Sequence, residues 1–101
     1  MPWHILARGR SLLFEWDGAN LEHIGRHDVE AEEAEEALLD PYRVSRTAYA
    51  AGSERREAIV AATEAGRKLF VVFTIRGQAI RVISAREATD VEKRAYRRQG
   101  K

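Results

Sequence analysis

The most apolar stretch of the chain is residues 69–75, which read Leu-Phe-Val-Val-Phe-Thr-Ile. This run is too short for a typical helix and too apolar for a strand with one solvated face, so it predicts a central strand covered on both sides. Arg76-Gly77-Gln78 follows as a tight turn, and residues 79–85 return as a second, more mixed strand. The pattern therefore predicts a β-hairpin at the centre of a small sheet.

Two helices are predicted ahead of this hairpin. Residues 14–17 indicate a short strand that ends in Asp17, a residue type that caps the first amides of a helix. The first helix is expected to stop near Asp28, and the second covers residues 29–40, with alanine and leucine on one face and glutamates on the other. Pro41 ends it, because the residue before a proline avoids helical angles.

Alternation of apolar and polar residues predicts two further strands, over residues 42–50 and 56–63. A Thr-x-x-Glu capping box at residues 89–92 opens a C-terminal helix. The predicted fold is α+β: a short strand and two helices, followed by a four-strand antiparallel meander and a C-terminal helix. We take residues 14–98 as a single domain and residues 1–13, whose spacing favours neither period, as an N-terminal extension.

Composition narrows the class of protein. A chain of 101 residues with 45% hydrophobic and 33% charged residues is typical of one soluble globular domain. It has no cysteine, which excludes a disulfide framework and a thiolate metal site and fits a cytoplasmic location. No stretch approaches the roughly 20 apolar residues of a membrane span, and no signal peptide is expected.

Although the net charge is only +1, acidic and basic residues are unevenly distributed along the chain. Between Glu15 and Asp40 there are ten acidic residues and one arginine, whereas from Arg67 onward there are ten basic residues and three acidic ones. A basic C-terminal half is predicted to attract polyanions, and the acidic segment is suited to a basic protein partner.

The polar residues of the chain suit one reaction in particular. Metal-binding motifs, a phosphate-binding glycine loop and a serine-centred elbow are all missing from the sequence, and His23 and His27 lack the acidic motif of a metal site. What remains is a set of arginines with a histidine and tyrosines. RNA cleavage by its own 2′-hydroxyl needs a base, an acid and cations around the phosphate, and arginine matches phosphate oxygens in a fork. No cofactor is expected.

Several motifs occur in the order found in one known family. They are Phe14-Glu15-Trp16-Asp17, Asn20-Leu21, Arg26-His27, Glu33-Ala34, Asp40-Pro41, Glu54-Arg55-Arg56, Phe73-Thr74-Ile75-Arg76-Gly77, Ile80-Arg81-Val82-Ile83-Ser84-Ala85-Arg86 and residues 92–96. Over roughly residues 14–98 the chain resembles the BrnT family of bacterial type II toxins, which are RelE-like ribonucleases. The resemblance implies a RelE-like fold and metal-independent cleavage of RNA, free or associated with the ribosome, that arrests translation. It also implies neutralisation by a DNA-binding BrnA antitoxin of the ribbon-helix-helix type.

One departure from the family pattern concerns the end of the first helix. The family usually has Lys-His-Gly where this chain has Arg26-His27-Asp28. Aspartate tolerates the left-handed backbone angles that such a glycine adopts, so we expect the fold to survive. The added carboxylate is expected to weaken phosphate binding nearby.

Eight side chains are candidates for the site. Those expected at the catalytic centre are His27, Arg56, Arg81 and Arg86. Those expected to bind substrate around it are Arg26, Arg76, Tyr96 and Trp16. Strict alternation places residues 81 and 86 on opposite faces of a strand, so these two arginines act together only if the strand ends or bulges between them.

Each candidate also has a purely structural interpretation. His27 is equally suited to closing a helix, Tyr96 to anchoring the last helix, Trp16 to the core, and the strand arginines to ion pairs that hold the fold. Two other functions are therefore kept beside the nuclease: a non-catalytic module that binds RNA or protein, and a protein-binding domain that uses the acidic helix. The free protein is expected to be a monomer or a dimer.

Overall fold

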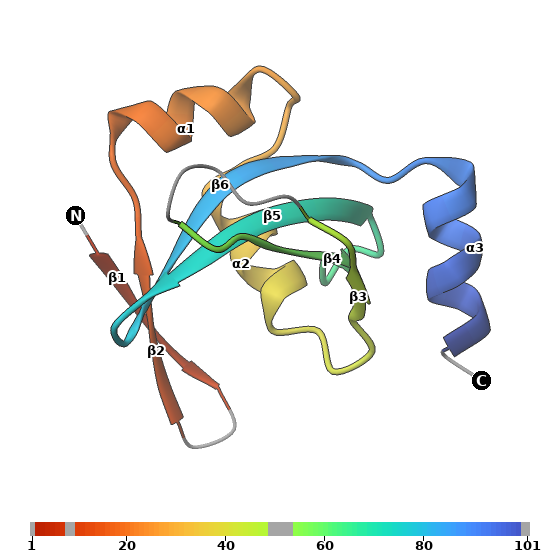
Figure 1. Cartoon of the computed structure of the whole chain (residues 1–101), viewed down its shortest axis with the longest axis horizontal. Helices are drawn as coiled ribbons and strands as arrows, with labels where there is room; N and C mark the ends of the chain where they lie inside the picture. Colours follow the sequence, from red (N-terminus) through yellow and green to blue (C-terminus); the bar gives the residue numbers. More distant parts are fainter. Residues whose placement is uncertain (1, 8–9, 49–53, 100–101) are drawn as a thin grey trace.

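The computed structural model describes residues 2–7, 10–48 and 54–99. Within these ranges the chain is α+β, as predicted, with its strands in one mixed sheet (Figure 1). The elements in chain order are β1 (Pro2–Ala7), β2 (Arg10–Glu15), α1 (Gly18–Gly25), α2 (Ala31–Leu38), β3 (Val44–Arg46), β4 (Glu57–Ala62), β5 (Lys68–Arg76), β6 (Ala79–Glu87) and α3 (Asp90–Gln99). None of these helices is long and apolar enough to cross a membrane.

The sheet has six strands in the order β1-β2-β6-β5-β4-β3. The last four elements of this order form the predicted antiparallel meander, with β5 and β6 as its central hairpin. Strand β3 is shorter than the predicted strand over residues 42–50, whose last two residues lie outside the described residues. The sheet has more strands than predicted. Strand β2, which begins at Arg10, pairs in parallel with β6, and β1 pairs antiparallel with β2.

The hydrophobic core lies on one face of the sheet, beneath α1 and α2 (Figure 1). The side chains that β5 contributes to it are Leu69, Val71 and Phe73. Successive strand residues point to opposite faces, so Phe70, Val72 and Thr74 point to the other side. Val72 and Thr74 are also buried, which confirms that the central strand is covered on both sides.

Helix termini follow the predicted caps. The Asp17 side chain accepts the backbone N–H groups of Ala19 and Asn20 at the start of α1. At the start of α3, Thr89 and Glu92 bond each other's backbone N–H groups, as the capping box predicts. Helix α3 packs against the end of the sheet at β3 and β4, opposite the β1–β2 hairpin (Figure 1).

An irregularity in β6 decides where its arginines point. Val72 pairs with Ser84 and Phe73 pairs with Val82, so Ile83 is an extra residue in β6 with no partner of its own on β5. This is the arrangement of a β-bulge, which shifts the alternation of the bulged strand by one residue. As a result Arg81 lies opposite Thr74, and Arg86 lies opposite Phe70.

Candidate functional site

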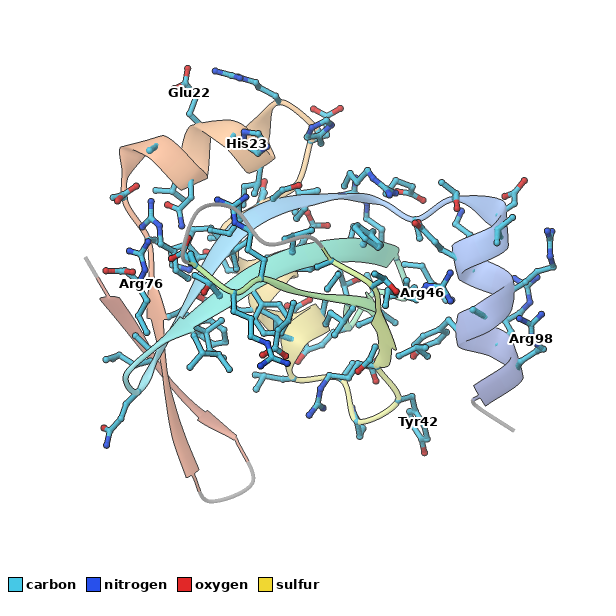
Figure 2. The ribbon with its side chains drawn as sticks, in the orientation of Figure 1. Glu22, His23, Tyr42, Arg46, Arg76 and Arg98 are labelled. Carbon is cyan, nitrogen blue, oxygen red and sulfur yellow. The ribbon has the colours of Figure 1, made fainter. Side chains whose placement is uncertain are left out.

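The face of the sheet opposite the core carries several arginines, and we call it the arginine face. The pairing register places Arg86 beside Phe70, Arg81 beside Thr74, and Arg46 in the row of Ala58 and Val72. Figure 2 shows Arg76 and Arg46 toward opposite ends of the sheet, with Arg46 on the side of α3. The arginine face consists of Arg46, Arg56, Arg76, Arg81 and Arg86 with the strand residues between them.

Three of these arginines share carboxylates near the β5–β6 turn. Arg81 donates from Nη1 to Asp17 Oδ2 at 3.0 Å and lies 3.8 Å from Glu15 Oε1. Arg76 Nη2 lies 2.8 Å from Glu54 Oε2, and its Nη1 lies 3.6 Å from the same Glu15 oxygen. Arg56 Nη2 lies 3.8 Å from Glu54 Oε1. We call this set the turn-end network: Glu15, Asp17, Glu54, Arg56, Arg76 and Arg81.

The turn-end network balances three guanidinium groups against three carboxylates. The hydrogen bond from Arg81, followed by that from the Asn20 backbone, lowers the pKa of Asp17. The hydrogen bond to Glu54 likewise raises the pKa of Arg76. Both shifts favour the charged forms of Asp17 and Arg76. A phosphate that enters must compete with these carboxylates for the arginines.

Arg86 has a different environment at the α3 end of the face. Its Nη1 and Nη2 donate to the two carboxylate oxygens of Glu92, both at 3.0 Å, and its guanidinium carbon lies 4.3 Å from the centre of the Phe70 ring. The bond from Arg86 is the main reason why the pKa of Glu92 is lowered. Beside this pair lies an open hollow of about 620 Å³, which we call the α3-end hollow, lined by Ser45, Arg46, Thr47, Phe70 and Glu92.

The bulge meets the condition under which Arg81 and Arg86 share one face of the sheet. Their partners on β5, Thr74 and Phe70, are four residues apart and therefore share a face. At about 3.3 Å per residue, four residues separate the two arginines by about 13 Å along the sheet. Asp17 holds the Arg81 guanidinium and Glu92 holds that of Arg86, so the two groups do not meet at one point.

His27 and Arg26 lie outside the arginine face, in the exposed turn that follows α1. The His27 ring is 6.0 Å from that of His23, and within the described residues no hydrogen bond or ion pair joins it to an arginine. Arg26 lies 3.7 Å from Glu22 on the same helix. Asp28 has a φ of 58°, which confirms that it adopts the left-handed conformation expected of the family's glycine.

Trp16 and Tyr96 are both engaged in holding the fold together. Trp16 is 2% exposed in the core, where its Nε1 donates to Glu35 Oε2 at 2.7 Å. The hydroxyl of Tyr96 donates to Asp40 Oδ2 at 2.6 Å, and burial and this bond raise its pKa to about 12. These positions match the structural interpretations of both residues, and we do not include either in the proposed site.

Sequence reasoning missed several residues of the arginine face. Phe70 was grouped with the core strand, although alternation along β5 assigns it to the face opposite Val71. The carboxylates Asp17, Glu54 and Glu92 were not considered as arginine partners, because residues so distant in sequence carry no signal of contact. Arg46 lies in the predicted strand over residues 42–50 but was not singled out as a candidate.

Comparison with known proteins identifies one family. The model of a family described as the ribonuclease toxin BrnT of type II toxin–antitoxin systems matches residues 16–92. The match begins at Trp16, includes the meander and ends at Glu92, which accepts the hydrogen bonds of Arg86. It leaves out β1 and β2. No curated protein matches the chain.

Proposed function

Because the chain belongs to the BrnT family of ribonuclease toxins of type II toxin–antitoxin systems, we propose that it cleaves RNA on the arginine face. The observation that carries this proposal is the convergence in the turn-end network of Arg56, just before β4, with Arg76 and Arg81 of the β5–β6 hairpin. Preorganised cations of this kind stabilise the charge that develops on a phosphate during transfer.

The proposed reaction uses the RNA's own 2′-hydroxyl as nucleophile. A bond forms between the 2′-oxygen and phosphorus, the bond from phosphorus to the 5′-oxygen breaks, and a 2′,3′-cyclic phosphate remains. The 2′-hydroxyl proton passes to a base, and the 5′-oxygen takes a proton from an acid or from water. Arg76 and Arg81 hold the phosphate oxygens, and this scheme requires no metal because the nucleophile belongs to the substrate.

Two residues compete for the role of base. Glu15 lies inside the network, with its Oε1 3.6 Å from Arg76 and 3.8 Å from Arg81. His27 is the residue predicted from the sequence, and it lies outside the network. The variants Glu15→Gln and His27→Gln separate the two, because cleavage should be lost only with the residue that acts as the base.

The test of the nuclease is cleavage of single-stranded RNA by the purified protein in EDTA. Arg81→Ala is expected to lose at least tenfold in rate, because it removes one donor to the transition state. Arg98→Ala, on the exposed surface of α3, is the control and is expected to retain the rate. RNA that stays intact with the unaltered protein, both free and on ribosomes, would refute the proposal.

In the cell we propose that cleavage arrests translation and that a ribbon-helix-helix antitoxin of the BrnA type neutralises the protein. Expression of the chain alone in a bacterial host should then stop growth. Co-expression of a small ribbon-helix-helix protein from the neighbouring reading frame should restore growth. Growth that is unaffected by the toxin gene alone contradicts this part of the proposal.

One observation favours a second function, a binding module without turnover. Every guanidinium of the turn-end network already has a carboxylate within 4 Å, so the network is neutral and stable without a ligand. A module of this kind binds RNA in a salt-sensitive manner, because phosphate contacts weaken as salt rises. Binding without any cleavage product would support this alternative.

A further inference from the structure

We propose that the exposed side of the Arg86 guanidinium, which lies beside the α3-end hollow, is a subsite on which an unpaired nucleobase stacks. The identity of the ligand as RNA rests on the proposed function. The subsite adds a substrate class to that function, namely RNA that is single-stranded at this point. In this proposal Arg86 contacts a base by stacking and does not bind a phosphate.

The geometry of Arg86 supports stacking. Its guanidinium lies over the Phe70 ring at 4.3 Å and is fixed by two hydrogen bonds of 3.0 Å to Glu92. Glu92 is itself held, because its Oε1 accepts the backbone N–H of Thr89 at 2.8 Å. The Arg86 side chain is still 36% exposed, whereas that of Glu92 is 13% exposed. Arg86 thus presents an ordered, flat group that a ligand can still reach.

The same hydrogen bonds argue against a phosphate at this position. Both terminal nitrogens of Arg86 bond the carboxylate of Glu92, which is only 13% exposed and is also held by Thr89, whereas the Asp17 side chain that pairs with Arg81 is 50% exposed. A phosphate therefore displaces Glu92 from Arg86 less readily than Asp17 from Arg81. The plane of a guanidinium remains suited to stacking, and unpaired bases of RNA commonly stack on arginine planes and on aromatic rings. A base is therefore the part of RNA that this site fits best.

The lining of the α3-end hollow suits the rest of a nucleotide. Ser45 and Thr47, both exposed, form part of its wall on the β3 edge of the sheet. Arg46, also exposed, supplies a positive charge for a phosphate beside the base. A volume of about 620 Å³ is within the usual range of small-ligand sites.

The position of the hollow relates the base to the site of cleavage. Arg86 lies about 13 Å along the sheet from Arg81, as the spacing of their partners on β5 implies. A base bound at Arg86 therefore belongs to a different nucleotide from the one whose phosphate Arg81 contacts. The two sites together would hold an extended, single-stranded segment of RNA along the arginine face.

The experiment compares two non-cleavable ligands of equal length at one salt concentration. One is a 2′-fluoro oligoadenylate, which lacks the 2′-hydroxyl nucleophile, and the other is the same backbone without bases. The unaltered protein is expected to bind the first at least about fivefold more tightly, as stacking on one base predicts. Arg86→Lys keeps the charge but removes the plane, so it should lose most of this preference while the salt dependence stays the same.

Two further variants complete the test. Phe70→Leu removes the ring beneath Arg86 and should reduce the preference in the same way, with circular dichroism to verify folding. Arg98→Lys makes the same chemical change as Arg86→Lys on the exposed surface of α3 and should have no effect. The proposal is overturned if Arg86→Lys retains the full preference for bases, or if the unaltered protein binds both ligands equally or neither.

This outcome is independent of cleavage. A preference for bases that depends on Arg86, with natural RNA left uncut, would retain the subsite and remove the nuclease. Cleavage of natural RNA with no such preference would retain the nuclease and remove the subsite.

Discussion

Arg81 and Arg86 lie on the same face of the sheet, although five residues separate them along β6. The extra residue Ile83 causes this, because it shifts the alternation between them by one position. The bulge therefore combines two arginines with different partners into one surface. Arg81 is held by Asp17 and Glu15 near the turn, and Arg86 by Glu92 near α3.

The first prediction concerns the carboxylate that competes for Arg81. Asp17 Oδ1 caps α1 and also accepts Arg81 Nη2 at 3.3 Å, while Oδ2 accepts Arg81 Nη1 at 3.0 Å. Asp17→Asn keeps the capping oxygen but removes the charge and the shorter bond, so α1 should remain intact while Arg81 is held more weakly. We expect RNA to bind severalfold more tightly, and the salt dependence to steepen by about 0.7 per added phosphate contact.

Glu22→Gln is the matched control for this change. It removes one negative charge from the exposed side of the same helix, where Glu22 pairs with Arg26 at 3.7 Å. If Asp17→Asn and Glu22→Gln alter RNA affinity equally, the effect comes from net charge and not from Arg81.

The second prediction concerns the left-handed residue after α1. Asp28 has a φ of 58°, a conformation that glycine adopts without a steric penalty. We expect Asp28→Gly to raise the free energy of unfolding by up to about 1 kcal/mol, and Asp28→Val to lower it by about 1–2 kcal/mol. Urea denaturation measures both. Asp28→Asn, which tolerates the same angles, should change little, and a destabilised glycine variant would contradict this explanation.

The third prediction concerns the bond between Tyr96 and Asp40. Tyr96→Phe removes a 2.6 Å hydrogen bond to a carboxylate, which should lower the free energy of unfolding by about 1.5 kcal/mol at neutral pH. The pKa of Tyr96 is raised from 10.0 to about 12 in the folded protein, so its contribution is complete below pH 10 and is lost as the pH rises through about 12.

Alkaline denaturation at several pH values checks this expectation. The difference between the unaltered protein and Tyr96→Phe should be constant up to pH 10 and should shrink toward pH 12. Tyr42→Phe, which removes a phenol that is 58% exposed, serves as the comparison. A difference that does not depend on pH would show that the hydroxyl acts in another way.

The fourth prediction concerns Glu35, which is 3% exposed in the core. Burial raises its pKa above the ordinary value of 4.5, and the hydrogen bond from Trp16 only partly opposes this. A raised pKa means that the folded state prefers the neutral carboxyl group. The contribution of Glu35 to stability is therefore complete below pH 4.5 and is lost as the pH rises through the folded-state pKa.

Glu35→Gln, which is neutral at every pH, should consequently be more stable than the unaltered protein at pH 7. The advantage should disappear as the pH falls below 4.5, since both side chains are then neutral. Chemical denaturation between pH 4 and pH 7 measures the difference. Glu64→Gln, in an exposed turn, is the control, and an advantage that persists at pH 4 would contradict the argument.

Local patterns predicted most of the fold. The meander, the central hairpin, the cap at Asp17 and the capping box at Thr89 all depend on residues close together in sequence, where alternation and capping rules apply directly. The β1–β2 hairpin was missed, because the apolar residues before Leu13 follow neither a helical nor a strand period. The parallel pairing of β2 with β6 joins Glu15 to Arg81, and no local rule predicts such a distant contact.

The site was harder to predict than the fold. Arginines were recognised by type, but their grouping depends on Ile83, and an apolar residue in an apolar strand gives no sign of a bulge. Their carboxylate partners lie 64 residues away for Arg81 and 22 for Arg76, beyond the range of sequence periodicity. His27 and Trp16 were chosen by chemical type, and only the structure shows that they do not lie on the arginine face.

The pairing of β2 with β6 also has a consequence for biosynthesis. Glu15 and Asp17 are made before their partner Arg81, which follows Asp17 by 64 residues. A nascent chain on the ribosome therefore lacks the completed arrangement of charges until β6 has been synthesised. For a protein that acts on RNA, this order of assembly would keep the growing polypeptide inert beside the machinery that produces it.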